Sequence, residues 1–253
     1  MKVTFLGTGT SQGVPIIACQ CHVCQSLDQK DKRLRSSVMV EIDGKVLVID
    51  SGPDFRQQML RENVQQLDAL IFTHSHKDHI AGMDDIRAFN YKFNTPVDVY
   101  ADALVQRAMH REFPYVFDPV KYPGVPEINL HEIGATPFIA AGIEVIPIEV
   151  MHMRLPVKGF RIKDFCYITD ANYIAEDEKA KILGSKVLVL NALRNEMHPS
   201  HFTLGEALEL ANELEVPQVY FTHISHQLGL HKTVEDSLPK GRNLAYDGLS
   251  LTF

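Results

Sequence analysis

The segment HSHKDH places four ligand-type side chains within six positions, directly after the apolar run LDALIF: His74, His76, Asp78 and His79. Residues two apart on an extended segment point the same way, so His74 and His76 can bind one metal ion. If a helix begins near Asp78, its first turn can present Asp78 and His79 to a second ion close by. Imidazole and carboxylate ligands together suit Zn, Mn or Fe better than Ca or Mg. The segment therefore predicts a metal centre at the end of a strand.

A second group of ligand-type residues is the cluster ACQCHVCQS, which contains Cys19, Cys21 and Cys24. A redox pair is disfavoured, because CHVC follows a Gly-rich loop and does not open a helix in a thioredoxin-like unit. A structural zinc would require a fourth ligand to complete its tetrahedron. The two candidates are Cys166, which also suits packing as a small buried hydrophobe, and His226 in THISH.

Alternating and apolar runs indicate the elements that must position these residues. We expect strands over residues 2–7, 36–52 (a hairpin around Asp43-Gly44), 67–74, 97–101, 142–152, 158–170, 186–192 and 217–225, with a closing hairpin over 243–253 around Asp247-Gly248. We expect helices over residues 54–63, 84–92, 102–112, 176–183 and 203–215, the last capped by Thr203. Residues 113–127, rich in Pro and aromatics, are predicted to form an ordered surface excursion. This order of elements favours an α/β sandwich of two sheets with helices outside.

Composition narrows the class of protein. The 253 residues suit a single layered domain spanning 1–253, and no apolar run approaches the length that a bilayer requires. The start, MKVTFLGTGTSQGVP, lacks the apolar core of a secretory signal, so we expect a cytoplasmic protein with reduced thiols and no membrane partner. The net charge of −7 argues against stable nucleic-acid binding. The oligomeric state is left open, with a homodimer among the options.

HSHKDH resembles the HxHxDH signature of the metallo-β-lactamase fold hydrolases, and the remaining signature residues are found in order along the chain, each after a β run: Asp50 before this segment, and His152, Asp170 and His223 after it. The resemblance implies an αββα four-layer sandwich and two divalent ions, Zn or Mn. His74, His76 and His152 would hold one ion, and Asp78, His79 and His223 the other. Asp170 would bridge the two ions, and Asp50 would support the metal loop.

In such a site a hydroxide shared by the two ions attacks the substrate, and the ions stabilise the anionic transition state. The bridging carboxylate suits phosphodiesterases better than true β-lactamases. We assign Asp78 to catalysis as well as to metal binding. In the phosphodiesterase branch, which includes tRNase Z, a histidine before a late helix contacts the scissile phosphate. His201 in HFTLGEALELA matches that position better than His198, and would assist the leaving group or the phosphate.

The run GTGTSQGVP followed by CxCxxC, together with THxxH near the C-terminus, resembles the PhnP family of phosphoribosyl cyclic phosphodiesterases. In that family the three cysteines and the second histidine bind a structural zinc, which implies Cys19, Cys21, Cys24 and His226 here. The resemblance implies hydrolysis of a small, cyclic phosphodiester. A tRNase Z-like nuclease, a thiolesterase of the same fold and a non-catalytic metal or redox sensor are the alternatives. Arg33 and Arg35 either face the substrate phosphate or belong to a solvated charge run, which we favour.

Overall fold

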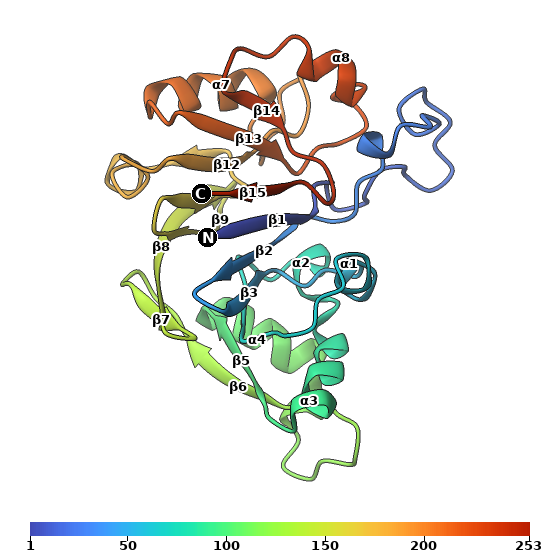
Figure 1. Cartoon of the computed structure of the whole chain (residues 1–253), viewed down its shortest axis with the longest axis vertical. Helices are drawn as coiled ribbons and strands as arrows, with labels where there is room; N and C mark the ends of the chain where they lie inside the picture. The colour runs from blue at the N-terminus through green and yellow to red at the C-terminus, as the bar shows by residue number, and fades with distance from the viewer.

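The computed structural model describes residues 1–253, and its strands form two sheets flanked by helices (Figure 1). The first sheet contains, in spatial order, β15 (Ser250–Thr252), β1 (Lys2–Gly7), β2 (Ser37–Ile42), β3 (Lys45–Ile49), β4 (Ala69–Ile71), β5 (Val97–Ala101) and β6 (Ile128–Glu132). The second contains β11 (Tyr173–Ile174), β8 (Ile143–His152), β9 (Leu155–Ile162), β10 (Phe165–Tyr167), β12 (Val187–Asn191), β13 (Gln218–Thr222) and β14 (Arg242–Leu244), with β7 (Phe138–Ala140) paired to β8. Sequence patterns did not reveal β6, β7 or β11.

Helices cover the outer face of each sheet. Those of the first half are α1 (Phe55–Arg61), α2 (Lys77–Ile80), the 3-10 turn η2 (Met83–Ile86), α3 (Arg87–Phe93), α4 (Ala103–Glu112) and α5 (Pro114–Phe117). A further 3-10 turn, η1 (Gln29–Asp31), lies in the connection between β1 and β2. Those of the second half are α6 (Glu176–Lys179), α7 (Leu204–Glu213), which Thr203 caps as predicted, and α8 (His231–Glu235). None of these helices has the length and apolar composition needed to cross a bilayer.

Three clusters of buried apolar side chains define the layers. One lies between the sheets, where Phe5 and Ile49 of the first sheet share a cluster with Phe160 and Val189 of the second. Another joins the outer face of the first sheet to α1, α3 and α4, and the last joins the second sheet to α7. The expected α/β class and αββα sandwich are thus confirmed.

Parallel strands determine where the chemistry collects. In the first sheet β3, β4, β5 and β6 run parallel, and in the second β10, β12, β13 and β14 do so. Ligand sites in α/β proteins favour the carboxyl ends of such strands. Asp50 follows β3, Asp170 follows β10 and His223 follows β13, and all three adopt left-handed backbone conformations, with φ of 67°, 54° and 56°. A positive φ is uncommon outside glycine, and such strained positions concentrate at functional sites.

The expected closing hairpin over 243–253 is wrong. β14 pairs in parallel with β13, whereas β15 pairs antiparallel with β1, so the Asp247-Gly248 turn crosses from one sheet to the other. Asp247 accepts hydrogen bonds from Thr8 Oγ1 at 2.8 Å and from the backbone N–H of Leu34 at 2.7 Å, which fixes the crossover. An Asp-Gly pair indicates a turn but not which strands the turn joins. The same signal at Asp43-Gly44 does connect a hairpin, β2–β3.

Candidate active site

The HSHKDH segment runs from the end of β4 into α2, as expected. His76 is the N-cap residue of α2, and Asp78 lies in the helix's first turn. The Nε2 atom of His74 and the Nδ1 atom of His76 are 3.0 Å apart, while His79 is fully buried. The extended backbone before the helix therefore brings two imidazoles together, and the helix directs the next two ligand-type side chains inward.

The loop after β3 holds this segment in place. Asp50 accepts hydrogen bonds from the backbone N–H of Thr73 at 2.9 Å, from Thr73 Oγ1 at 2.8 Å and from Nδ1 of His79 at 2.7 Å. A Cβ added to Gly52 would lie 2.0 Å from the carbonyl oxygen of Asp78, so only glycine allows the loop to approach α2 this closely. These contacts give Asp50 the supporting position that the resemblance implied.

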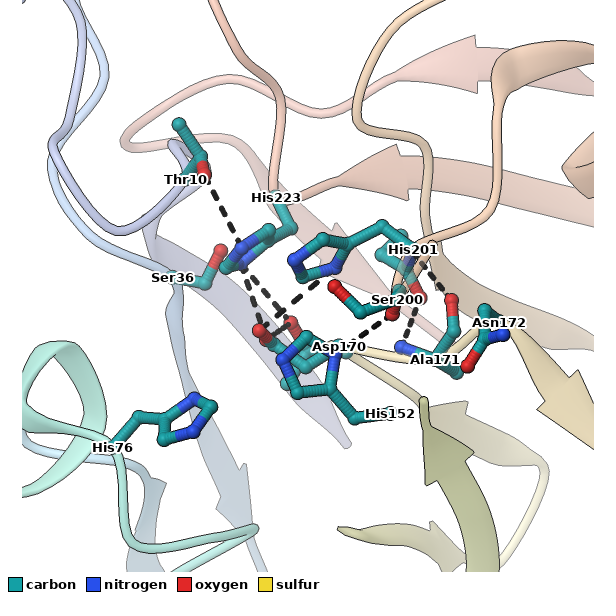
Figure 2. A network of polar contacts seen from close by, with 12 residues as sticks. Thr10, Ser36, His76, His152, Asp170, Ala171, Asn172, Ser200, His201 and His223 are labelled. Atoms are coloured by element: carbon teal, nitrogen blue, oxygen red, sulfur yellow. Dashed lines mark hydrogen bonds and ion pairs between the residues drawn. The ribbon is translucent and has the colours of Figure 1, made fainter. Parts of the chain in front are cut away.

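Asp170 belongs to two groups of ligand-type side chains. Figure 2 shows its carboxylate among His152, His201 and His223. Its Oδ2 atom is 3.2 Å from Nδ1 of His223 and 3.3 Å from Nε2 of His79, and Asp78 belongs to the same group. Its Oδ1 atom is 3.9 Å from Nε2 of His74, which with His76 forms the second group. One carboxylate is therefore within reach of two sets of donors, the arrangement that a bridging ligand requires.

The donor set fits a divalent cation. Because Nδ1 of His79 donates to Asp50, Nε2 presents a lone pair, and this buried atom has no hydrogen-bond partner. It faces carboxylate oxygens of Asp78 at 3.2 Å and Asp170 at 3.3 Å. Buried acceptors that face one another repel unless a proton or a cation lies between them. A metal ion held by His79, Asp78 and Asp170 would remove this repulsion.

In the site, burial and neighbouring charges shift the pKa values of the ligand-type side chains in opposite directions. Burial would lower the pKa of His79, but Asp78, Asp170 and Asp50 outweigh it and raise that pKa well above its usual value. Burial would raise the pKa of Asp170, but His223, His79 and His74 hold it well below its usual range. Burial and the neighbouring His79 lower the pKa of His74. Neutral imidazoles and ionised carboxylates are the forms that bind metal.

His152 ends β8, and its ring centroid lies 5.2 Å from that of His76. Its Nδ1 atom donates to the backbone carbonyl of Ser200 at 2.7 Å, which leaves Nε2 free. A ligating histidine commonly donates its other ring N–H in this way. The ligand-type atoms of His152 group with Asp170 and His201 rather than with His74 and His76.

The two late histidines differ in position. His201 is buried, its ring stacks on that of His223 at 4.8 Å between centroids, and its Nδ1 is 4.0 Å from Oδ1 of Asp170. Burial, with a smaller contribution from His223, lowers the pKa of His201 to about 3. His198 contacts the ring of His201 at 5.1 Å and belongs to no group of ligand-type atoms. The structure therefore places His201 among the ligand-type side chains, whereas His198 contacts only the ring of His201 and joins none of these groups.

The three clustered cysteines meet His226. Its Nδ1 atom is 3.4, 3.3 and 3.5 Å from the Sγ atoms of Cys19, Cys21 and Cys24, and all three are free thiols. With Zn–S of about 2.3 Å and Zn–N of about 2.0 Å, tetrahedral zinc would place nitrogen and sulfur about 3.5 Å apart. A hydrogen bond from the backbone N–H of Cys24 lowers the pKa of Cys21 to about 6. Cys166 lies buried in β10, outside this cluster.

Neither reading of the KRLRSS segment fits the structure. Arg33 is buried and donates to Thr8 Oγ1 at 2.8 Å, to the carbonyl of Ala245 at 2.6 Å and to Nδ1 of His231 at 3.1 Å. Arg35 pairs with Asp54 at 3.0 Å. The guanidinium group of Arg33 is buried, whereas that of Arg35 is partly exposed beside Asp54. A charge run in the sequence gives no sign of the burial of Arg33.

Several residues at the site carried no sequence signal. Thr73 links Asp50 to the Nδ1 atom of His74, and Thr169 donates to Asp170 at 2.7 Å. Thr10, in the Gly-rich loop, lies 3.4 Å from Nε2 of His223. These hydroxyl side chains, like the carbonyl of Ser200, orient ligand-type residues. Thr10 belongs to the run GTGTSQGVP, but the run itself gave no sign of this contact.

Comparison with known proteins identifies the relatives of this chain. Residues 45–224 match the β-lactamase superfamily domain. The crystal structure of a new diphosphatase from the PhnP family is 39% identical, with a TM-score of 0.93 over 100% of this chain and 97% of that chain. Human tRNase Z, short form, is 18% identical with a TM-score of 0.71, over 100% of this chain and 99% of that chain, and shares the fold.

Among curated proteins, an octanoyltransferase of Porphyromonas gingivalis is 38% identical over 252 residues, which is 98% of this chain. The match covers 51% of that protein, so the chain spans about half of its length. The family match covers most of the present chain, and the identity to the diphosphatase extends over nearly its full length. The chain therefore belongs to the β-lactamase superfamily and, within it, to the PhnP family.

Proposed function

We propose that this protein is a metal-dependent phosphodiesterase that hydrolyses a small phosphodiester, with cyclic phosphates as the leading class. The observation that carries the proposal is the position of Asp170, within reach of His74 and His76 on one side and of Asp78, His79 and His223 on the other. Two divalent ions held by these residues and His152 would activate water and neutralise the phosphate. We propose Zn or Mn for these two ions, with a further structural zinc at Cys19, Cys21, Cys24 and His226.

The chain's own residues account for the other requirements. Asp78 and Asp170 supply the negative charge that retains the cations, and Asp50 keeps His79 in the tautomer whose Nε2 faces them. His201, beside Asp170 and His223, is placed to donate a ring N–H to a phosphate oxygen or to the departing oxygen. Its burial lowers its pKa, and a bound phosphate anion would favour protonation there.

A second candidate substrate class is a small diphosphate. It is favoured by the 39% identity to a diphosphatase over nearly the full length of both chains. A tRNase Z-like nuclease is disfavoured by the net charge of −7. The octanoyltransferase is about twice as long as this chain. A thioester is therefore an alternative substrate, which the experiment below includes.

A substrate screen on the metal-loaded protein decides among these classes. The panel contains 2′,3′-cyclic nucleotides, ribose cyclic phosphates, a dinucleoside diphosphate and an octanoyl thioester, with tRNA binding followed by gel shift. The proposal predicts turnover of the cyclic phosphates and no salt-sensitive shift of tRNA. Turnover of the thioester alone would replace the proposal with a thiolesterase activity. A salt-sensitive tRNA complex with cleavage would replace it with a tRNase Z-like nuclease.

A further inference from the structure

Asn191 ends β12 next to two segments that carry candidate metal ligands. β12 lies between β10 and β13, so Asn191 lies between the segment that leads to Asp170 and the segment that leads to His223. In the pairing with β13, Asn191 is opposite Thr222, the residue before His223. Asn191 is fully buried, so its amide must find hydrogen-bond partners within the protein.

The partners of the Asn191 amide both belong to Ala171, the residue that follows Asp170. Oδ1 of Asn191 accepts a hydrogen bond from the backbone N–H of Ala171 at 2.8 Å, and Nδ2 donates to the carbonyl of Ala171 at 3.0 Å. Asp170 has φ of 54°, a conformation that persists only where surrounding contacts impose it. The two hydrogen bonds from Asn191 restrain the backbone directly after this strained residue.

The carbonyl of Ala171 also holds the segment that carries His201. It accepts a second hydrogen bond, from the backbone N–H of Phe202 at 2.7 Å. Figure 2 shows Ala171 close to both Asp170 and His201. A backbone carbonyl has two lone pairs, and here one is used by Asn191 and the other by the residue after His201. One peptide group therefore joins the loop of the candidate metal bridge to the segment of the candidate phosphate donor.

We propose that Asn191 is a positioning residue that fixes the carboxylate of Asp170 relative to the ring of His201. Its side-chain hydrogen bonds are made to Ala171 alone, so it acts on both groups through the backbone. The inference rests on the proposed function, because it takes Asp170 as the metal bridge and His201 as the donor to the phosphate. Small displacements of groups that must meet a reacting phosphate lower the rate strongly.

Asn191→Leu keeps the branched shape of the side chain and removes both hydrogen bonds. For the metal-loaded protein, kcat with 2′,3′-cyclic nucleotides is expected to fall about 10–100-fold, with little change in KM. Asn191→Asp retains an acceptor for the N–H of Ala171 and should recover part of the kcat. Calorimetric titration of the metal-free proteins should show the same order of metal affinity: wild type, then Asn191→Asp, then Asn191→Leu.

Asn90 of α3 provides a matched control. It is also a buried asparagine whose amide bonds to backbone groups: Nδ2 donates to the carbonyls of Thr95 and Glu127, and Oδ1 accepts from the N–H of Glu127. None of these residues belongs to a metal group. Asn90→Leu should lower the unfolding temperature but leave kcat and metal affinity unchanged. Equal losses of kcat in Asn90→Leu and Asn191→Leu would show general destabilisation and overturn the positioning role.

Metal affinity separates this inference from the proposed function. If the wild type hydrolyses no phosphodiester, but Asn191→Leu weakens metal binding and Asn191→Asp restores part of it, the proposed function fails and the positioning of Asp170 stands. If the wild type hydrolyses cyclic phosphates and Asn191→Leu matches it in kcat and metal affinity, the positioning role fails alone. Absence of hydrolysis together with unchanged metal affinity would contradict both. Should Asn191→Leu not fold, wild-type kcat and metal affinity in Asn191→Asp would overturn the inference, because this variant lacks the donor to Ala171.

Discussion

The Oδ2 atom of Asp50 accepts a hydrogen bond from Nδ1 of His79 at 2.7 Å, and both side chains are fully buried. This contact determines which nitrogen of His79 faces the carboxylates of Asp78 and Asp170. The Asp50 carboxylate follows β3 in the first sheet, whereas Asp170 follows β10 in the second. Residues from both sheets therefore contribute to one cation-binding position, and the sandwich must be assembled before the position exists.

Asp50→Asn tests the supporting role of this residue. The amide removes the negative charge and weakens the preference for the required His79 tautomer, so metal affinity should fall about 10–100-fold. Metal titration followed by calorimetry measures the change. The matched variant Asp54→Asn alters a carboxylate that pairs with Arg35 outside the metal groups and should bind metal as the wild type does. Equal affinities for wild type and Asp50→Asn would contradict the role.

Cys21→Ser tests the structural zinc. Serine is a poor zinc ligand, so the variant should contain one zinc fewer per chain than the wild type and unfold at lower temperature. Elemental analysis of the purified protein measures the content. Cys166→Ala removes the thiol that lies outside the cluster and should keep the full zinc content. No loss of zinc in Cys21→Ser would contradict the assignment of this cluster.

His201→Ala tests the proposed donor to the phosphate. Removal of a general acid or positioned donor lowers kcat about 10²–10⁴-fold, and both active-site ions should be retained. His198→Ala should have a much smaller effect, because His198 lies behind His201 and joins no metal group. Rate measurements with elemental analysis on the same samples separate lost catalysis from lost metal. An unchanged kcat in His201→Ala would remove the role.

His231 should make stability depend on pH. Burial, reinforced by Arg33, lowers its pKa to about 4 in the folded chain. The unfolded chain, with a pKa near 6.5, binds more protons between these values, so the free energy of unfolding should fall as pH drops from about 6.5 towards 4. His231→Gln removes this titration, so wild type and variant should converge in stability from pH 7 to pH 5 in urea unfolding. Parallel decreases in the two proteins would contradict the prediction.

Sequence reasoning singled out side chains that the fold does bring together, because these ligand-type residues are chemically distinctive and follow recognisable strands. His74, Asp170 and His223 each end a β run, and the carboxyl ends of such strands meet at one edge. For the fourth ligand of the cysteine cluster, the residues alone left both Cys166 and His226 open. Only the family resemblance favoured His226, since 207 residues separate it from Cys19.

What escaped prediction depends on tertiary contacts. The carbonyl of Ser200, which orients His152, is a backbone group present in every residue. Arginine is a hydrophilic residue type and is expected at the surface. Arg33 is buried because its guanidinium finds partners from distant parts of the chain, including Ala245 and His231. The pairing of β15 with β1 was not predicted, because the Asp-Gly turn at Asp247 does not specify which strand the following strand joins.

Metal removal and reconstitution test the central claim most directly. Chelator-treated protein should lose turnover of bis(p-nitrophenyl) phosphate and of 2′,3′-cyclic nucleotides, and regain it on addition of Zn or Mn. Recovery should saturate at two ions per chain beyond the zinc of the cysteine cluster. Asp170→Asn, which removes the shared carboxylate, should not recover activity at the same metal concentration. Undiminished turnover after complete metal removal, or a reloaded protein that cleaves no phosphodiester, would contradict the account.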